Sequence, residues 1–201
     1  MRRLLALGLA LALAGVALAQ NVQESIAASG QAAIKAAIAR VAPAVVKVEA
    51  TRKVSTWWDW FFQDPFFRRF FGEPETTRTS LGSGFVVEYE GKKYILTNYH
   101  VVENATSIVV TAQSGDSWRA QVVGTDDLLD LAVLTVDRMN LPAAPLGDSD
   151  ALEIGDWVIA IGNPLGFSHT VTLGIVSALN RDVPKPDGSG YYRRMIQTDA
   201  A

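Results

Sequence analysis

After residue 43 the chain consists of short apolar segments, set too close together for helices of ordinary length to fit between them. These segments are rich in Val, Ile and Thr and are separated by Gly, Asp, Asn or Pro at fairly regular spacing. Such a pattern is typical of an antiparallel barrel or sandwich and not of a parallel α/β sheet, so the sequence predicts an all-β fold. The expected strands are "AVVKVEA", "LGSGFVVEYE", "GKKYILTN", "SIVVTA", "WRAQVVG", "LAVLTV", "DWVIAIG", "TVTLGIVSAL" and "MIQT".

The first residues have the composition of an export signal. Arg2 and Arg3 are followed by an uninterrupted apolar stretch, residues 4–16, and then by the small-x-small site at residues 17–19. We therefore interpret residues 1–19 as a cleaved signal peptide, which predicts a bacterial periplasmic, cell-envelope or secreted protein. The alternative is that the apolar stretch, which approaches spanning length, remains uncleaved as a membrane tether.

Two segments near the N-terminus do not have the strand pattern. Residues 20–43 are rich in Ala, carry Ile at helical spacing and end at Pro43, which predicts a short helix. Residues 57–75 hold three Trp and six Phe interrupted by Asp, Arg and Pro, and they match neither a helix nor a strand period. This aromatic loop either buries its own rings or forms a surface for partner chains or a gate near a site.

Composition excludes several kinds of chemistry. The chain has no cysteine, so a disulfide framework, a thiolate nucleophile and a Cys-based zinc site are ruled out, and its two histidines leave little for a metal site. Loss of Arg2 and Arg3 with the signal would take the formal charge from −3 to −5. A mildly acidic chain gives no electrostatic basis for binding nucleic acid, and we expect no cofactor.

One of the two histidines, His100, lies where an apolar strand ends in "YILTNYHVVENA". A histidine at such a point can face a solvent-exposed site while its backbone stays anchored, but general-base catalysis also needs an acceptor for Nδ1. Asp130, flanked by leucines in "DDLLDLAVLTV", is the candidate, because a carboxylate in apolar surroundings is costly unless it is paired. The alternative is that Asp130 only caps the backbone at the start of a strand.

Together, "ILTNYHVVENA", "DLLDLAVLTV" and "IGNPLGFSHTVTLGIVSALNR" resemble the HtrA (Deg) family of trypsin-like serine proteases, in the family's order over nearly the whole mature chain. "DPFFRRFFG" is similar to an aromatic loop found in many of its members. The resemblance implies a double β-barrel of the chymotrypsin/trypsin type. Residues 44–150 would form the first barrel, nearly complete, and residues 151–201 a truncated part of the second.

The resemblance implies that His100 is the catalytic base and Asp130 the aspartate that orients it. The family's serine follows shortly after "QTDAA", at which this chain ends, so we expect the nucleophile to be absent, the chain as it stands to be inactive, and the sequence to be a fragment. Ser83 in "GSG" and Ser189 in "DGSGYY" are poor substitutes, since neither lies in a G-x-S-x-G elbow. His169 is expected to be a loop histidine.

The function that the resemblance implies is an exported serine endopeptidase of protein quality control, which cuts unfolded or damaged proteins. It also implies a homotrimer and a downstream PDZ domain, neither of which can be inferred from these residues. The alternative is a non-catalytic envelope module that holds misfolded chains through the aromatic loop. A binding module has no need of His100 and Asp130, and this favours the enzyme.

Overall fold

The computed structural model describes residues 25, 28–53, 77–163, 170–185, 188 and 190–200. The expected signal peptide, the aromatic loop, His169 and Ser189 lie outside the described residues. The chain divides into two compact units, Met1–Arg40 and Val41–Ala201. Residues 28–41 are helical, as the spacing of the isoleucines predicts, and no helix in the described part is both long and apolar enough to cross a membrane.

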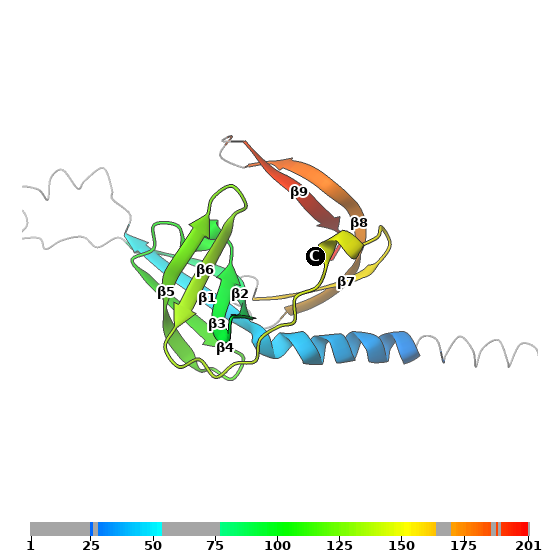
Figure 1. Ribbon diagram of the computed structural model, residues 1–201, viewed down its shortest axis with the longest axis horizontal. Coiled ribbons are helices and arrows are strands. Elements are labelled where there is room, and N and C mark those ends of the chain that lie inside the picture. Colours follow the sequence, from blue (N-terminus) through cyan, green and yellow to red (C-terminus); the bar gives the residue numbers. More distant parts are fainter. Residues whose placement is uncertain are drawn as a thin grey trace, which may run out of the picture. The chain divides into compact units, whose positions relative to one another are not determined.

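The second unit is built almost entirely of strands, with the elements labelled in Figure 1. Its short helical turns are η1 (Ala42–Ala44), α3 (Tyr99–Val102) and η3 (Ser149–Ala151). Its strands are β1 (Val45–Lys53), β2 (Thr77–Tyr89), β3 (Lys92–Thr97), β4 (Ser107–Ala112), β5 (Ser117–Asp126), β6 (Leu131–Val136), β7 (Trp157–Gly162), β8 (Thr170–Pro184) and β9 (Tyr191–Thr198).

Among the described residues, six strands close into a barrel in the order β1-β2-β3-β6-β5-β4. All of its pairings are antiparallel, and β1 closes the barrel by pairing with β2 on one side and β4 on the other. The β2–β3 hairpin turns at Glu90 and Gly91, both with positive φ, as the sequence predicted. A bulge between Val122 and Gly124 shifts the register of β5 against β6.

The barrel interior is filled by alternate residues of its strands. In β1, Val46, Val48 and Ala50 are buried, while the residues between them are more exposed. Because successive side chains of a strand point to opposite faces, this alternation directs one set of branched side chains into a common core. The core also holds fully buried side chains from the other barrel strands, Val86, Ile95, Val110 and Leu134. Ile95 and Leu134 are direct partners across β3 and β6.

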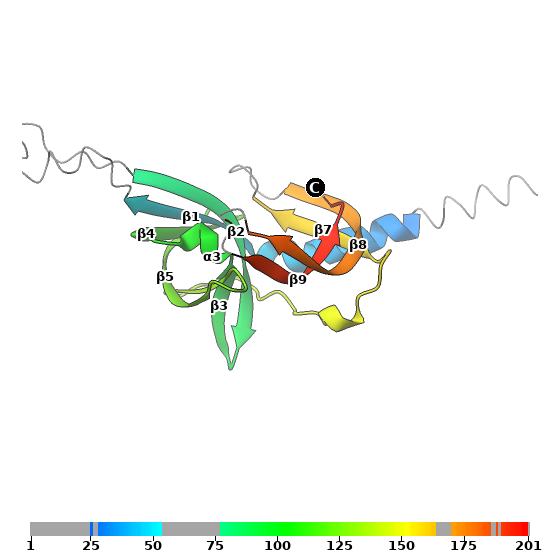
Figure 2. The same cartoon turned by 90° about the horizontal axis from the view of Figure 1, so that it is seen from above.

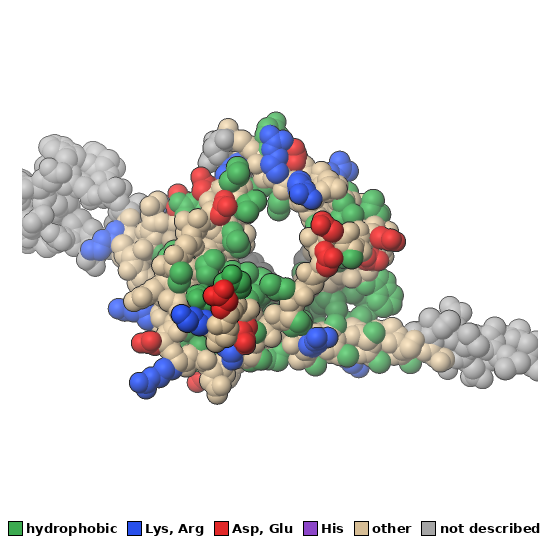
Figure 3. Space-filling model, in the orientation of Figure 1, with side chains coloured by type: hydrophobic (Ala, Val, Ile, Leu, Met, Phe, Trp, Pro, Cys, Tyr) green, Lys and Arg blue, Asp and Glu red, His purple; other side chains and the backbone are tan. Residues whose placement is uncertain are grey.

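The remaining strands form a three-stranded antiparallel sheet in the order β7-β8-β9. Its apolar side chains are much less covered than those of the barrel, and Figure 3 shows hydrophobic side chains over β7 and β8 at the surface. Trp157 is 62% exposed and Leu173 is 49% exposed. The closed barrel and the second sheet confirm the expected all-β fold.

Several strands extend beyond their expected bounds, and β2 and β9 begin well before the predicted residue. The strand expected to begin at Leu81 starts at Thr77, because Thr77 to Ser80 pair with the polar end of β1 up to Lys53. The strand expected as "MIQT" starts at Tyr191, which pairs with Pro184 at the far end of β8. In both cases the extension lies in polar or aromatic sequence, where pairing with a neighbouring strand and not hydrophobic alternation sets the limit.

Candidate active site

His100 lies on a one-turn helix that follows β3 directly. Asn98 is the residue before α3, and Val101 and Val102 within α3 are buried in the barrel core. Figure 2 shows this short helix beside the barrel strands, and it contacts β1, β2 and β6. Since the two valines anchor the turn, the His100 side chain is directed outward, and it is 63% exposed.

Asp130 lies at the end of the turn that connects β5 with β6. Within this turn, Leu129 N–H donates to Asp126 Oδ1 at 2.9 Å. Asp130 has a φ of 52°, in the left-handed region that Asp and Asn tolerate better than most residues. Its side chain is only 12% exposed. The turn therefore presents the carboxylate of Asp130 in one defined direction.

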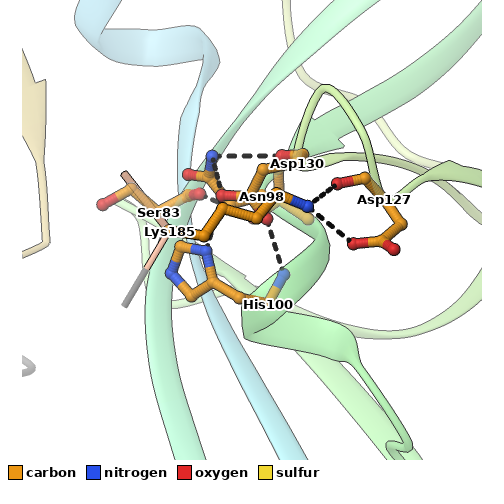
Figure 4. A network of polar contacts seen from close by, with 7 residues as sticks. Ser83, Asn98, His100, Asp127, Asp130 and Lys185 are labelled. Carbon is orange, nitrogen blue, oxygen red and sulfur yellow. Dashed lines mark hydrogen bonds and ion pairs between the residues drawn. The ribbon is translucent and has the colours of Figure 1, made fainter. Parts of the chain in front are cut away.

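The two side chains meet in the geometry of a base and its orienting acid (Figure 4). His100 Nδ1 lies 2.7 Å from Asp130 Oδ2, and the backbone N–H of His100 donates to Asp130 Oδ1 at 2.9 Å. With the proton on Nδ1 facing the carboxylate, Nε2 is left with a lone pair to accept a proton. The structure thus brings together the two residues singled out from the sequence.

The leucines that flank Asp130 do not surround its carboxylate, contrary to the sequence prediction. Its leucine neighbours were taken to place the carboxylate in apolar surroundings, but Leu128 and Leu129 are 67% and 64% exposed, and Leu131 is 37% exposed. The carboxylate is covered instead by the segment that carries His100, which supplies polar donors. Hydrogen bonds with Asn98 and His100, and not an apolar environment, account for the position of the carboxylate.

A further pair of contacts near the site joins the β8–β9 end of the second sheet to the turn that holds Asp130. Lys185 Nζ donates to Asp127 O at 2.9 Å and lies 3.2 Å from Asp127 Oδ1. Its side chain is 11% exposed and its ammonium group is 5.4 Å from the ring centroid of Tyr192. Nothing in the sequence pairs Asp127 with a lysine 58 residues further along the chain.

Ser83 has a position defined by other contacts. Its Oγ accepts a hydrogen bond from Asn163 N–H at 2.7 Å, and its carbonyl accepts one from Thr97 Oγ1 at 2.8 Å. A Cβ on Gly162 would lie 2.8 Å from this same Oγ, so Ser83 holds β2 close to the end of β7. Such a serine has a structural role. Within the described part of the chain, no cluster of three or more His, Asp and Glu could hold a metal ion.

Comparison with known proteins agrees with this geometry. The family described as "Trypsin-like peptidase domain" matches residues 82–201. "Putative serine protease HhoA" of Synechocystis is 41% identical over 189 residues, covering 90% of this chain and 48% of the relative. A "Probable periplasmic serine endoprotease DegP-like" of Halomonas elongata is 42% identical over 184 residues, covering 82% and 38%.

Comparison with solved structures points to the same family of proteases. The "HtrA-type protease AlgW with decapeptide" is similar with a TM-score of 0.61 and 46% identity, covering 82% of this chain and 50% of that one. The closed barrel, the second sheet and the histidine–aspartate contact therefore define a trypsin-like peptidase domain. The chain belongs to the HtrA/DegP-like group of this family. It spans about half the length, or less, of the relatives that it matches.

Proposed function

We propose that the chain carries the general base and the orienting acid of an exported serine endopeptidase. The single observation that supports this most directly is the 2.7 Å contact between His100 Nδ1 and Asp130 Oδ2, with His100 otherwise exposed. His100 Nε2 would take the proton from a serine hydroxyl as it attacks a peptide carbonyl and then return it to the leaving amine. Asp130 would hold the tautomer and stabilise the imidazolium form.

The nucleophilic serine is proposed and is not one of the site residues described above. Ser83 Oγ already accepts a hydrogen bond from Asn163 N–H, which does not suit a nucleophile. On the family resemblance we propose that the nucleophile and its oxyanion hole lie outside these 201 residues and that the chain as written does not cleave peptides. Residues 44–150 and 151–201 would then be the first barrel and part of the second.

The proposed substrates are unfolded or damaged proteins in the bacterial envelope. Their unfolded or damaged state is what the family resemblance implies. Two observations support a peptide substrate in the envelope: relatives are named periplasmic DegP-like endoproteases, and an HtrA-type relative is solved with a decapeptide. The leader-like residues 1–19 support export. A homotrimer is proposed on the family resemblance alone, and light scattering of the purified protein would test it.

The test uses the product of the complete reading frame. With casein as substrate, we expect His100→Ala to lower kcat by about 10⁶-fold and Asp130→Asn by about 10⁴-fold. His169→Ala and Asp137→Asn are matched controls that exchange the other histidine and an exposed aspartate, and they should retain full activity. Cleavage that survives His100→Ala would remove the assigned base. Binding of unfolded casein without any cleavage would favour the non-catalytic binding module.

A further inference from the structure

Asn98 makes two contacts with the residue proposed to orient the base. Its Nδ2 donates to Asp130 Oδ2 at 3.1 Å and to the Asp130 carbonyl at 3.2 Å (Figure 4). The carbonyl also accepts from Tyr99 N–H at 3.1 Å. A single amide group therefore hydrogen-bonds to both the backbone carbonyl and the side chain of Asp130, whose φ lies in the left-handed region.

The hydrogen bond from Asn98 to Oδ2 is important because His100 Nδ1 contacts the same oxygen. Among the described residues, the donors that contact the Asp130 carboxylate are His100 N–H at Oδ1, His100 Nδ1 at Oδ2, and Asn98 Nδ2 at Oδ2. Two of these three donors belong to the residue that the carboxylate must orient. The His100 backbone N–H contacts Oδ1, so Asn98 Nδ2 is the donor at Oδ2 that does not belong to the imidazole, and it holds this oxygen in place when the ring moves.

We propose that Asn98 is a positioning residue, which fixes the Asp130 carboxylate so that the imidazole of His100 keeps its proton on Nδ1. The role in peptide cleavage rests on the proposed function, whereas the effect on the tautomer of His100 does not.

The first experiment needs neither a serine nor a substrate. In the 201-residue chain carrying His169→Asn, His100 is the only histidine, and ¹⁵N NMR of its ring at alkaline pH gives the ratio of the two neutral tautomers. We expect Nδ1–H to predominate, with a far-downfield Nδ1–H proton signal. Asn98→Ala should shift the ratio toward Nε2–H by about tenfold, the scale of one hydrogen bond to a charged group, and should broaden the signal.

Two further variants separate positioning from packing. Asn98→Asp keeps the shape of the side chain but replaces the donor by an oxygen that repels the carboxylate, so it should shift the ratio at least as far as Asn98→Ala. Asn140→Ala, at an exposed asparagine, should leave the ratio unchanged. An unchanged ratio in folded Asn98→Asp would overturn the proposal. So would rapid exchange of both side-chain amide protons of Asn98 in the unmodified protein, a measurement that does not depend on any variant folding.

In the product of the complete reading frame, Asn98→Ala should lower kcat for casein about tenfold while KM changes less than about twofold. A merely structural role would lower the folded fraction and leave kcat per folded molecule unchanged, as measured after correction by urea unfolding. If the tautomer shifts but the unmodified protein does not cleave casein, the positioning role stands and the proposed protease function fails. If the unmodified protein cleaves and Asn98→Ala alters neither quantity, only the positioning role fails.

Discussion

Gly82 in β2 lies against the helix turn that carries His100, and this makes Gly82→Ala a sharp test of how the site is supported. A Cβ at residue 82 would lie 2.7 Å and 2.9 Å from the two γ-carbons of Val101. Both distances are well inside ordinary van der Waals contact, about 3.5–4.0 Å between carbons. Val101 is 6% exposed and follows His100 directly, so it has little room to withdraw.

The expected cost follows from this overlap. Inserting a methyl group into a well-packed core costs about 1–3 kcal/mol, and we expect Gly82→Ala to lower the free energy of unfolding by about 2 kcal/mol. Backbone strain does not contribute, because Gly82 is not among the positive-φ residues. Since the relief must come from moving α3, the ring signals of His100 should shift as well.

A double-mutant cycle identifies the contact responsible. Val101→Ala removes two buried methyl groups, which costs about 1.6 kcal/mol in transfer free energy before any cavity term. In the double variant the new methyl of residue 82 occupies part of the space that Val101 has vacated. The double variant should therefore be about as stable as Val101→Ala alone, with a coupling energy of about 2 kcal/mol.

Equilibrium urea unfolding, followed by fluorescence with unchanged m-values, measures these differences. Gly147→Ala is the matched control, because a Cβ at residue 147 would meet nothing within 4 Å. It should be neutral or slightly stabilising. Strict additivity of Gly82→Ala and Val101→Ala would refute the idea that this contact supports α3.

Two other predictions concern single hydrogen bonds. Thr97→Val keeps the shape of a side chain that is 6% exposed but removes its hydrogen bond to the Ser83 carbonyl. Urea unfolding should show that the free energy of unfolding falls by about 1–3 kcal/mol, and that Thr97→Ser, which keeps the hydroxyl, lowers it less. The pKa of Asp182 is lowered, first by the side-chain hydrogen bond from Arg193 and then by the backbone N–H of Arg194. The contribution of Asp182 to stability is therefore present above the ordinary Asp pKa of about 3.9 and is lost as the pH falls through the lower pKa of the folded state. Arg193→Gln should raise the pKa of Asp182 toward its ordinary value in a carboxyl ¹³C titration, and a curve identical to that of the unmodified protein would contradict this.

The parts of the fold that the sequence predicts are those set by local patterning. The alternation of valines in β1, the Glu90–Gly91 turn and the placement of His100 just after β3 all follow from side-chain period and turn chemistry within a few residues. The early start of β2 was missed because its polar first residues are strand only through pairing with β1. Lys185 was missed for a similar reason, since its contact with Asp127 joins positions 58 residues apart.

Asn98 shows what a single sequence can and cannot reveal about the site. An amide two residues before a histidine, at the junction of a strand and a helix turn, is a visible signal, but its meaning depends on what lies across the sheet. The same residues are equally compatible with Asn98 acting only as the N-cap of a helix, because Asn is favoured at that position. Only the neighbouring strand, with Asp130 before it, identifies the acceptor.

The register between β3 and β6 explains why the histidine and the aspartate meet at all. Thr97 pairs with Ala132, so the antiparallel ladder continued beyond β3 brings Tyr99 opposite Asp130, and Tyr99 N–H does donate to the Asp130 carbonyl at 3.1 Å. His100 follows by one residue, and the left-handed φ of Asp130 turns its carboxylate back toward it. A one-residue slip of this ladder would point the two side chains to opposite faces of the barrel. The buried pair Ile95 and Leu134, which belongs to the same ladder, therefore sets the position of the site as well as filling the core.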